Sequence, residues 1–397
     1  MRHLFTILLI LAGAASARAC NVPVFRYALE NWPADAYEVW VFHDQPLTAE
    51  QSQWIADLRQ QVVGRDKQLD SFFIEVMDVS QPMPDKAKAA YAKLKPAQHP
   101  WLVVQFPHSH ADDPPAFSGL LTKEMMQQIA DSPTRRRIAK GILEGQSAVW
   151  LLIESGDKAQ DDAAAALLTK ELTRLEKELV LPTIGEDDKK FFDPSRGPRL
   201  RIAFEVLRLS REAAGEAMLL RMLEGWDPKL TDRSKPMAFA FFGLGRVLPP
   251  LVGDLIEPRY IEDASIFLVG RCSCQIKNDN PGWDVLMPVE WDGAIEGSFT
   301  LADAKPILTT AAAVTQQNQE LTSAAGTGDV TAMMKGDSAD GAALHVVTAT
   351  GAQTGVPSRV LDPATGSPVL RNLLIVAGAV IALLLVGTVV LKSRREG

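Results

Sequence analysis

The chain has 397 residues, enough for two domains and additional segments, and its composition is that of a globular protein, 47% hydrophobic and 23% charged. A protein that binds nucleic acid needs a basic surface, and the formal net charge here is −8. The composition therefore argues against nucleic acid as a partner. The local basic run Arg135-Arg136-Arg137 is interpreted as a solvated helix face.

A signal peptide is predicted over residues 1–19. Two basic residues precede an apolar run from Leu4 to Ala15, and Ala17-Arg18-Ala19 fits the small-x-small cleavage pattern. Cleavage there would leave Cys20 as the first residue of the mature chain. Lipid modification of Cys20 is the alternative, but the residues before it fit the lipoprotein pattern poorly.

A short helix is predicted next, because Phe25, Leu29 and Trp32 recur at helical spacing and Pro33 ends the segment. We expect it to pack on the first sheet.

Strands and helices then alternate. Tyr37–His43 alternates in polarity and is rich in strand-forming residues, and Thr48-Ala49-Glu50-Gln51 matches a capping box at the start of a helix that runs to about Val63. The remaining elements predicted in this region are a strand at 71–79, a helix at about 84–94, a strand at 101–106, and a helix after Thr122 that is broken near Ser132-Pro133.

A second round with the same element order begins at Ala148. Its predicted elements are strands at 148–154 and 201–208, helices at 161–179 and 212–223, a strand after Pro236, a short strand at 246–248 and a closing helix at 261–268. The repeated order predicts two α/β domains, 20–145 and 146–295. The alternative is one larger α/β domain with an unrelated sheet.

The C-terminal quarter of the chain is predicted to be a tether and a membrane anchor. Residues 296–370 are rich in small and polar residues, which bury too little apolar area to order a chain, so a disordered linker is expected. The apolar stretch 371–391 is long enough, at about 30 Å, to cross a bilayer as one helix. The basic tail 392–397 follows, so we expect a single-pass protein of the cell membrane with its C-terminus cytoplasmic and its body outside.

The order of strand, helix, proline-led strand, turn and helix around Gln98-His99-Pro100-Trp101 resembles the C-terminal half of a thioredoxin fold. The resemblance places Pro100 where that family keeps its cis-proline, and Pro236 at the same place in the second round. It implies tandem thioredoxin-like domains. The segments Cys20-Asn21-Val22-Pro23-Val24-Phe25 and Cys272-Ser273-Cys274-Gln275-Ile276-Lys277 are also similar to uncharacterised membrane-anchored bacterial proteins, a resemblance that brings no activity.

Redox-active thioredoxins carry Cys-x-x-Cys between the first strand and the helix that follows it. Here those places hold His43-Asp44-Gln45-Pro46 and Glu154-Ser155-Gly156-Asp157, without a cysteine. Dithiol chemistry needs a reactive thiolate and a resolving partner. The sequence therefore argues against the usual activity of the family, and it identifies no catalytic residue.

The resemblance also implies that the residue before the cis-proline faces the turn after the first strand. His43, Asp44 and His99 would then approach one another, as a Zn or Cu site or as an acid–base pair. The alternative is two partly exposed loop histidines. The run from His108 to Asp113 also has metal-binding residue types, and it is interpreted as a solvated hairpin loop.

The three cysteines are Cys20, Cys272 and Cys274, in a compartment expected to be oxidising. Cys20 could pair with one of the other two and clamp the N-terminus to the second domain. Cys272 and Cys274 could instead form a strained, exchangeable bridge, or bind a soft metal such as Cu(I) as thiolates. Simply buried or free thiols are the fourth interpretation.

Two functional hypotheses follow. The first is a non-enzymatic scaffold or protein-binding module that holds an envelope or membrane-protein partner outside the membrane and needs no cofactor. The alternative is thiol–disulfide exchange or copper handling through Cys272 and Cys274.

Overall fold

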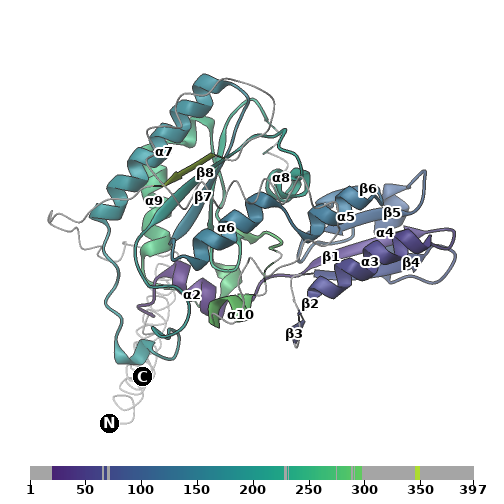
Figure 1. Cartoon of the computed structure of the whole chain (residues 1–397), viewed down its shortest axis with the longest axis horizontal. Helices are drawn as coiled ribbons and strands as arrows, with labels where there is room; N and C mark the ends of the chain where they lie inside the picture. Colours follow the sequence, from purple (N-terminus) through teal and green to yellow (C-terminus); the bar gives the residue numbers. More distant parts are fainter. Residues whose placement is uncertain are drawn as a thin grey trace, which may run out of the picture. The chain divides into compact units, whose positions relative to one another are not determined.

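The computed structural model describes residues 20–64, 67–68, 72–227, 230, 232–273, 275–287, 289, 291–296 and 345–348. The chain divides into two compact units, Met1–Val356 and Pro357–Gly397, and every described residue belongs to the first. This unit contains two mixed sheets with helices packed on them (Figure 1), so the predicted α/β class is confirmed.

The first sheet has four strands in the order β4-β1-β5-β6. β1 is parallel to β4 and antiparallel to β5, and β5 is antiparallel to β6. The strands are β1 (Tyr37–His43), β4 (Phe72–Asp78), β5 (Trp101–Gln105) and β6 (Phe117–Leu120), and the helices are α3 (Ala49–Val62), α4 (Asp85–Leu94) and α5 (Lys123–Ala130). A small hairpin of β2 (Val63–Gly64) and β3 (Lys67–Gln68) follows α3.

The second sheet repeats this arrangement. Its central order is β8-β7-β9-β10, with β7 parallel to β8, antiparallel to β9, and β9 antiparallel to β10. These strands are β7 (Ala148–Ile153), β8 (Phe204–Leu209), β9 (Met237–Phe242) and β10 (Arg246–Val247). Additional strands join at the edges: β11 (Leu251–Val252), β12 (Trp283–Asp284) and β13 (His345–Thr348).

Helices cover both faces of the second sheet. α7 (Lys158–Glu178) and α9 (Pro258–Val269) lie on one face, and α6 (Pro133–Leu143) and α8 (Ala217–Glu224) on the other (Figure 1). All residues of β7 and β9 are buried, which explains why both strands are almost continuously apolar. The short helices are α10 (Trp291–Glu296) and the 3-10 turns Glu186–Asp188, Gly253–Leu255 and Lys277–Asp279.

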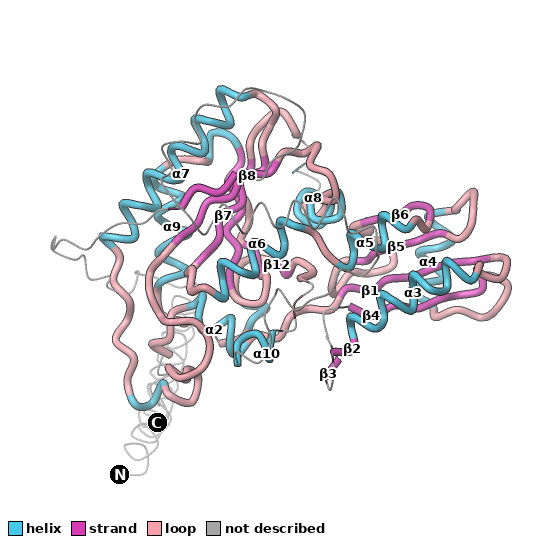
Figure 2. The backbone as a smooth tube through the Cα atoms, in the orientation of Figure 1, coloured by secondary structure: helices cyan, strands magenta, loops and turns pink. Residues whose placement is uncertain are grey.

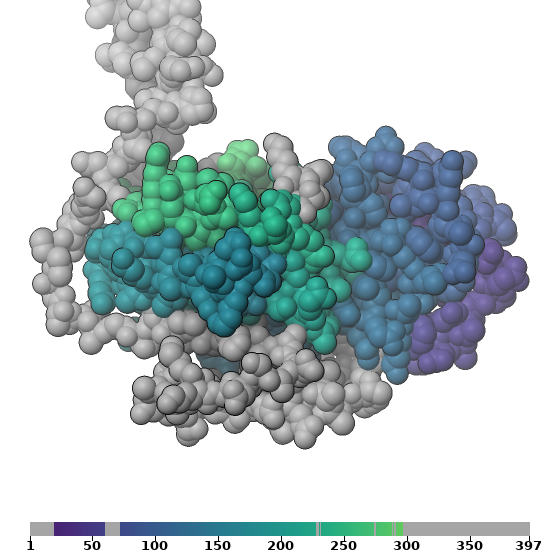
Figure 3. Space-filling model, turned by 90° about the horizontal axis from the view of Figure 1, so that it is seen from above, coloured from purple at the N-terminus to yellow at the C-terminus, as the bar shows by residue number. Residues whose placement is uncertain are grey.

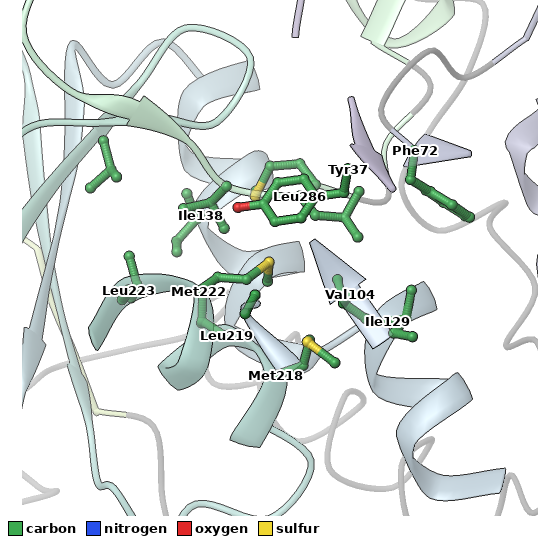
Figure 4. Packing of buried hydrophobic residues seen from close by; sticks show 14 of the residues in the cluster. Tyr37, Phe72, Val104, Ile129, Ile138, Met218, Leu219, Met222, Leu223 and Leu286 are labelled. Carbon is green, nitrogen blue, oxygen red and sulfur yellow. The ribbon is translucent and has the colours of Figure 1, made fainter. Parts of the chain in front are cut away.

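One hydrophobic cluster extends from the first sheet to the second (Figure 4). Val104 of β5 and Ile129 of α5 belong to it together with Met218 and Met222 of α8 and Leu286. In the space-filling view the purple-to-blue surface of the first region directly meets the teal-to-green surface of the second (Figure 3). The two sheets therefore share part of one core.

The N-terminal helix α2 (Val24–Asn31) packs on the second sheet, so the prediction that it packs on the first sheet was wrong. It contacts α9 and β9, and its position beside the second sheet is visible in Figure 2. Val24 N–H donates to Gly270 O at 3.0 Å, which ties the chain before α2 to the end of α9. Periodicity identifies the apolar face of this helix but not the sheet that the face covers. The sheet lies more than a hundred residues further along the chain.

Several predicted segments lie outside the described residues. These are the signal peptide 1–19, the membrane span 371–391, the cytoplasmic tail 392–397 and Cys274. Of the predicted linker 296–370, the described part beyond Glu296 is β13, which pairs antiparallel with β8. Within the part of the chain that is described, no helix is both long and apolar enough to cross a bilayer.

Candidate functional site

Three polar side chains meet at the end of the first sheet where β1 ends and β5 begins. His99 Nδ1 lies 3.3 Å from Asp44 Oδ2, and His99 Nε2 lies 3.0 Å from the hydroxyl oxygen of Tyr91. The side chain of His99 is only 12% exposed, whereas that of Asp44 is 52% exposed. We call these three residues the Asp44–His99–Tyr91 cluster.

The strand pairing explains why these residues meet. Phe42, near the end of β1, pairs with Trp101 at the start of β5, so the loop after β1 lies beside the residues that precede β5. The His99–Pro100 peptide bond is cis, as the resemblance to the thioredoxin fold implied. Tyr91 comes from α4 and is held by ring contacts with Phe42, at 5.0 Å, and with His99, at 5.9 Å between ring centroids.

The neighbours of the two ring nitrogens indicate a tautomer for His99. Asp44 Oδ2 lies 3.3 Å from Nδ1 as an ion-pair contact, and because a carboxylate only accepts hydrogen bonds, its charge favours the proton on Nδ1. In the neutral ring Nε2 is then an acceptor, and the Tyr91 hydroxyl donates to it. Both ring nitrogens are thus engaged, and binding a metal would require His99 to give up one of these partners.

His43 does not join the cluster through any interaction recorded among the described residues. Its Nδ1 lies 3.0 Å from the carbonyl oxygen of Gln45, within its own loop. No group of three or more His, Cys, Asp or Glu side chains that could hold a metal occurs in the described part of the chain. The structure therefore brings together Asp44 and His99 of the predicted set, and the Zn or Cu site stays a prediction.

The loop after each first strand is stabilised by its own polar groups. At the start of α3, Gln51 N–H donates to Thr48 Oγ1 at 3.1 Å and Thr48 N–H donates to Gln51 Oε1 at 3.0 Å, which confirms the predicted capping box. At the start of α7, Asp157 accepts from two backbone N–H groups of the helix. Asp161 accepts from Ser155 N–H, Ser155 Oγ–H and Gly156 N–H at 2.7 to 3.0 Å.

The cysteine region is organised by backbone hydrogen bonds. Cys272 N–H donates to Val22 O at 2.9 Å, and Pro23 forms an antiparallel bridge with Arg271. The side chains of Cys20 and Cys272 are buried in the same hydrophobic cluster, at 2% and 0% exposure. Cys20 is a thiol, so no disulfide joins it to Cys272 in this structure, and burial raises the pKa of the Cys20 thiol.

The structure also tests the predictions made for Pro236 and for the loop that contains His108 and His110. Among the described residues, His99–Pro100 is the cis peptide bond, and the peptide before Pro236 is trans, so Pro236 as a cis-proline was wrong. The carbonyl oxygen of Pro236 accepts from Gly253 N–H at 2.9 Å, which continues the extended pairing of β9 with β11. His108 and His110 lie in the loop between β5 and β6, as interpreted, and His108 Nε2 lies 3.2 Å from Asp35 Oδ1.

Sequence reasoning missed a set of buried charges. Arg135 is fully buried, contrary to the solvated face predicted for its basic run. Glu205 of β8 is fully buried and ion-paired with Arg137 of α6, and burial raises its pKa to about 7 against the opposing effect of Arg137. No local signal reveals these partners, because Glu205 alternates with apolar residues as an exposed strand residue would.

A second buried network connects segments that are distant in sequence. Asp284 accepts from Arg246 Nη1 at 3.2 Å and from Lys277 Nζ at 2.6 Å, and Lys277 also lies 2.8 Å from Asp35 Oδ1. Asp35 precedes β1, and Asp284 lies in β12. This network therefore links the entry to the first sheet with an edge of the second sheet.

Comparison of the chain with protein-family models, with curated proteins and with solved structures found no match.

Proposed function

We propose that this chain is a membrane-anchored, extracytoplasmic protein whose two thioredoxin-like folds are redox-inactive and bind another protein of the envelope. The anchor and the location rest on the two terminal sequence signals described above. The fold assignment and the binding role rest on the arrangement of the two sheets and their first loops.

The strand order supports the thioredoxin-like assignment of both regions. In each sheet the first strand lies between the second, which is parallel to it, and the third, which is antiparallel to it. The fourth strand pairs antiparallel with the third in both sheets. In the first sheet the third strand is preceded by the cis peptide before Pro100, the position that the resemblance assigns to it.

The proposal rests on the loop that follows the first strand of each sheet. We call residues 44–48, between β1 and α3, the first loop, and residues 154–157, between β7 and α7, the second loop. Neither contains a cysteine, and both use their polar groups to cap the helix that follows. Disulfide exchange needs a thiolate as the attacking group, and a loop without a cysteine cannot supply one. A thioredoxin-like fold without the cysteine motif still presents an ordered surface, and such a surface can bind another protein.

The two loops differ in how their polar groups are engaged, which points to the first as the contact with a partner. The second loop is drawn onto Asp161 by three hydrogen bonds. In the first loop Asp44, Gln45 and Pro46 are exposed, beside the partly exposed His99 and Tyr91. This loop therefore presents a carboxylate, an amide and aromatic surface together, a mixture suited to a polar protein interface.

The alternative prediction, thiol–disulfide exchange or copper handling through Cys272 and Cys274, has less support. The side chain of Cys272 is fully buried, and exchange requires access of an attacking thiolate to the sulfur.

The experiment is site-specific photocrosslinking in cells that produce the full chain. A photoreactive amino acid replaces Gln45 in the first loop, and the matched control places it at Lys158, which is 87% exposed beside the second loop. We expect position 45 to crosslink to one envelope protein and position 158 not to do so. The Tyr91→Phe and His99→Ala variants should weaken the crosslink from position 45.

A parallel assay separates binding from catalysis. The full chain should not accelerate reduction of insulin disulfides by dithiothreitol, and replacing Cys20, Cys272 and Cys274 by serine should leave the crosslink from position 45 intact. Disulfide reductase activity that disappears in the triple serine variant would instead support the thiol alternative. Equal crosslinking from both positions would remove the first loop from the proposal.

A further inference from the structure

The first sheet ends on one side at β4, and no strand of the described residues pairs with the outer edge of β4. β4 pairs with β1 over all seven of its residues, from Phe72 to Asp78, without a bulge. Natural edge strands are usually protected against further pairing by shortness, by lysine or proline, or by a bulge. The opposite edge strand, β6, has only four residues, whereas β4 has none of these protective features.

The backbone of β4 is accessible at this edge. Alternate residues of an edge strand turn their backbone N–H and C=O groups outward. The carbonyl oxygen of Ile74 accepts a hydrogen bond from Nη2 of Arg59, an exposed side chain of α3, at 3.4 Å. A hydrogen bond of this length to a flexible, solvated donor is weak, so a backbone N–H of an added strand can replace it.

Two exposed side chains of β4 define what an added strand would meet. Phe73 is 48% exposed, and Glu75 is exposed without an ion-pair partner among the residues that the structure describes. Alternate side chains of a strand share a face, and Met77 of this face is buried in a cluster with residues of α4. Helix α4 thus covers one end of this face and leaves an apolar and an acidic side chain open beside the edge.

The second sheet shows how the same kind of edge is completed. β8 is the counterpart of β4, because each is the second strand of its sheet and runs parallel to the first. β13 pairs antiparallel with β8 on the side away from β7. The chain therefore adds a strand of its own beyond β8, and its described residues supply no such strand for β4.

The edge of β4 is continuous with the first loop. His43, the last residue of β1, pairs with Asp78, the last residue of β4, and Val79 N–H donates to His43 O at 3.0 Å. The first loop begins at the next residue after His43. A partner that contacts this loop therefore also meets the end of β4.

We propose that the outer edge of β4 takes up an extended segment of the partner protein as an added antiparallel strand, with a basic side chain opposite Glu75 and an apolar one opposite Phe73. Backbone hydrogen bonds supply the affinity in this mode of recognition, and alternate side chains supply the selectivity. The inference rests on the proposed function, because it assigns how the partner is held. A second copy of β4 fits less well, since full antiparallel pairing of two β4 strands places Glu75, the middle residue, opposite itself, and like charges in that position repel.

The test uses the full chain and two labelled peptides, Thr-Thr-Val-Lys-Val-Val-Thr and the same sequence with Glu in place of Lys, designed to place the central charge opposite Glu75. Fluorescence anisotropy should show saturable binding of the Lys peptide, at least about threefold tighter than binding of the Glu peptide. Glu75→Lys should reverse this preference, whereas the control Glu124→Lys, at an exposed acid of α5, should keep it. The Lys peptide with methylated backbone nitrogens should not bind, because methylation removes its backbone donors.

Crosslinking locates the bound peptide. A photoreactive amino acid in place of Phe73 should crosslink the Lys peptide, and one in place of Leu120, which is 41% exposed on the opposite edge strand β6, should not. The proposal is wrong if the Lys peptide does not bind, if Glu75→Lys leaves the preference unchanged, or if the methylated peptide binds equally well. It is also wrong if the unaltered chain is a dimer that Phe73→Lys separates, because the occupant would then be a second copy. The crosslink from position 45 to an envelope protein tests the proposed function separately, and it can persist when the peptide fails to bind.

Discussion

The guanidinium of Arg135 donates a hydrogen bond to the carbonyl oxygen of Leu286, 2.7 Å away and 151 positions further along the chain. The same side chain also donates to the carbonyl oxygens of Gln128 and Ile129, at the end of α5. Burial lowers the pKa of this guanidinium, and no solvent reaches it. One cation thus holds α5, the start of α6 and the segment before α10 together.

Replacing Arg135 by Met should destabilise the fold by about 3 kcal/mol or more, because several buried carbonyl oxygens lose their donor at once. Urea unfolding of the full chain, followed by circular dichroism, measures the change. Arg136→Met is the matched control: its ion pair with Asp131 is partly exposed and should cost less than about 1 kcal/mol. Equal losses in the two variants would contradict the role given to Arg135.

The stability of the protein should depend on pH through Glu205. Its pKa is raised from 4.5 to about 7 in the folded protein, with burial as the largest cause. Below pH 4.5 the carboxyl is protonated in both states; as pH rises toward 7, the unfolded chain ionises first, so folding stability falls. Above about pH 7 the loss is complete, on the order of 3 kcal/mol.

The measurement is urea unfolding at pH 5, 6, 7 and 8 for the unaltered chain and for Glu205→Gln. Other groups titrate in both proteins, so the difference between the two curves isolates Glu205. As pH rises, the free energy of unfolding of Glu205→Gln should increase relative to that of the unaltered chain. A difference that is constant across the range would show that Glu205 is already ionised at pH 5.

His99 should be protonated at Nδ1 when the ring is neutral. The two ring nitrogens have distinct ¹⁵N shifts in each tautomer, so histidine-labelled full chain reports the tautomer directly. Tyr91→Phe should keep Nδ1 protonated because Asp44 is unchanged, whereas Asp44→Ala should raise the population with the proton on Nε2. An Nε2-protonated ring in the unaltered chain would reverse the assigned donor and acceptor between His99 and Tyr91.

Gly141 allows α6 to lie close to the second sheet. A Cβ at this position would stand 2.7 Å from Glu205 Oε2 and 2.7 Å from Val149 Cγ2. Glycine to alanine usually stabilises an open helix by up to about 1 kcal/mol, but here we expect Gly141→Ala to lower stability, because both neighbours are fully buried. Thermal unfolding decides the sign, and an increase in melting temperature would contradict the close packing.

Local sequence predicted the elements of this fold well and their partners poorly. The strand Tyr37–His43 and the break between α5 and α6 have the predicted bounds, because polarity alternation and a proline are signals within a few residues. The burial of Arg135 depends on Leu286, and the burial of Glu205 depends on Arg137 of α6. Such contacts are fixed by tertiary packing, which periodicity within one segment does not contain.

The candidate site was predicted in part for the same reason. A resemblance that included a cis-proline predicted that His99 and His43 approach each other with Asp44 nearby, and the structure places Asp44 beside His99. It did not include Tyr91, which reaches His99 from α4 and carries no motif. His43 was assigned to the cluster by the same resemblance, as the residue of the turn that faces His99, but its Nδ1 lies 3.0 Å from the carbonyl oxygen of Gln45 instead.

The position of α2 determines when this helix can be buried during synthesis of the chain. Residues 37–130 form a contiguous set of strands and helices and can pair as soon as they leave the ribosome. Helix α2 emerges earlier, yet β9 and α9, which bury it, are made about two hundred residues later. The apolar face of α2 can therefore be buried against its final partners only after most of the body has been synthesised.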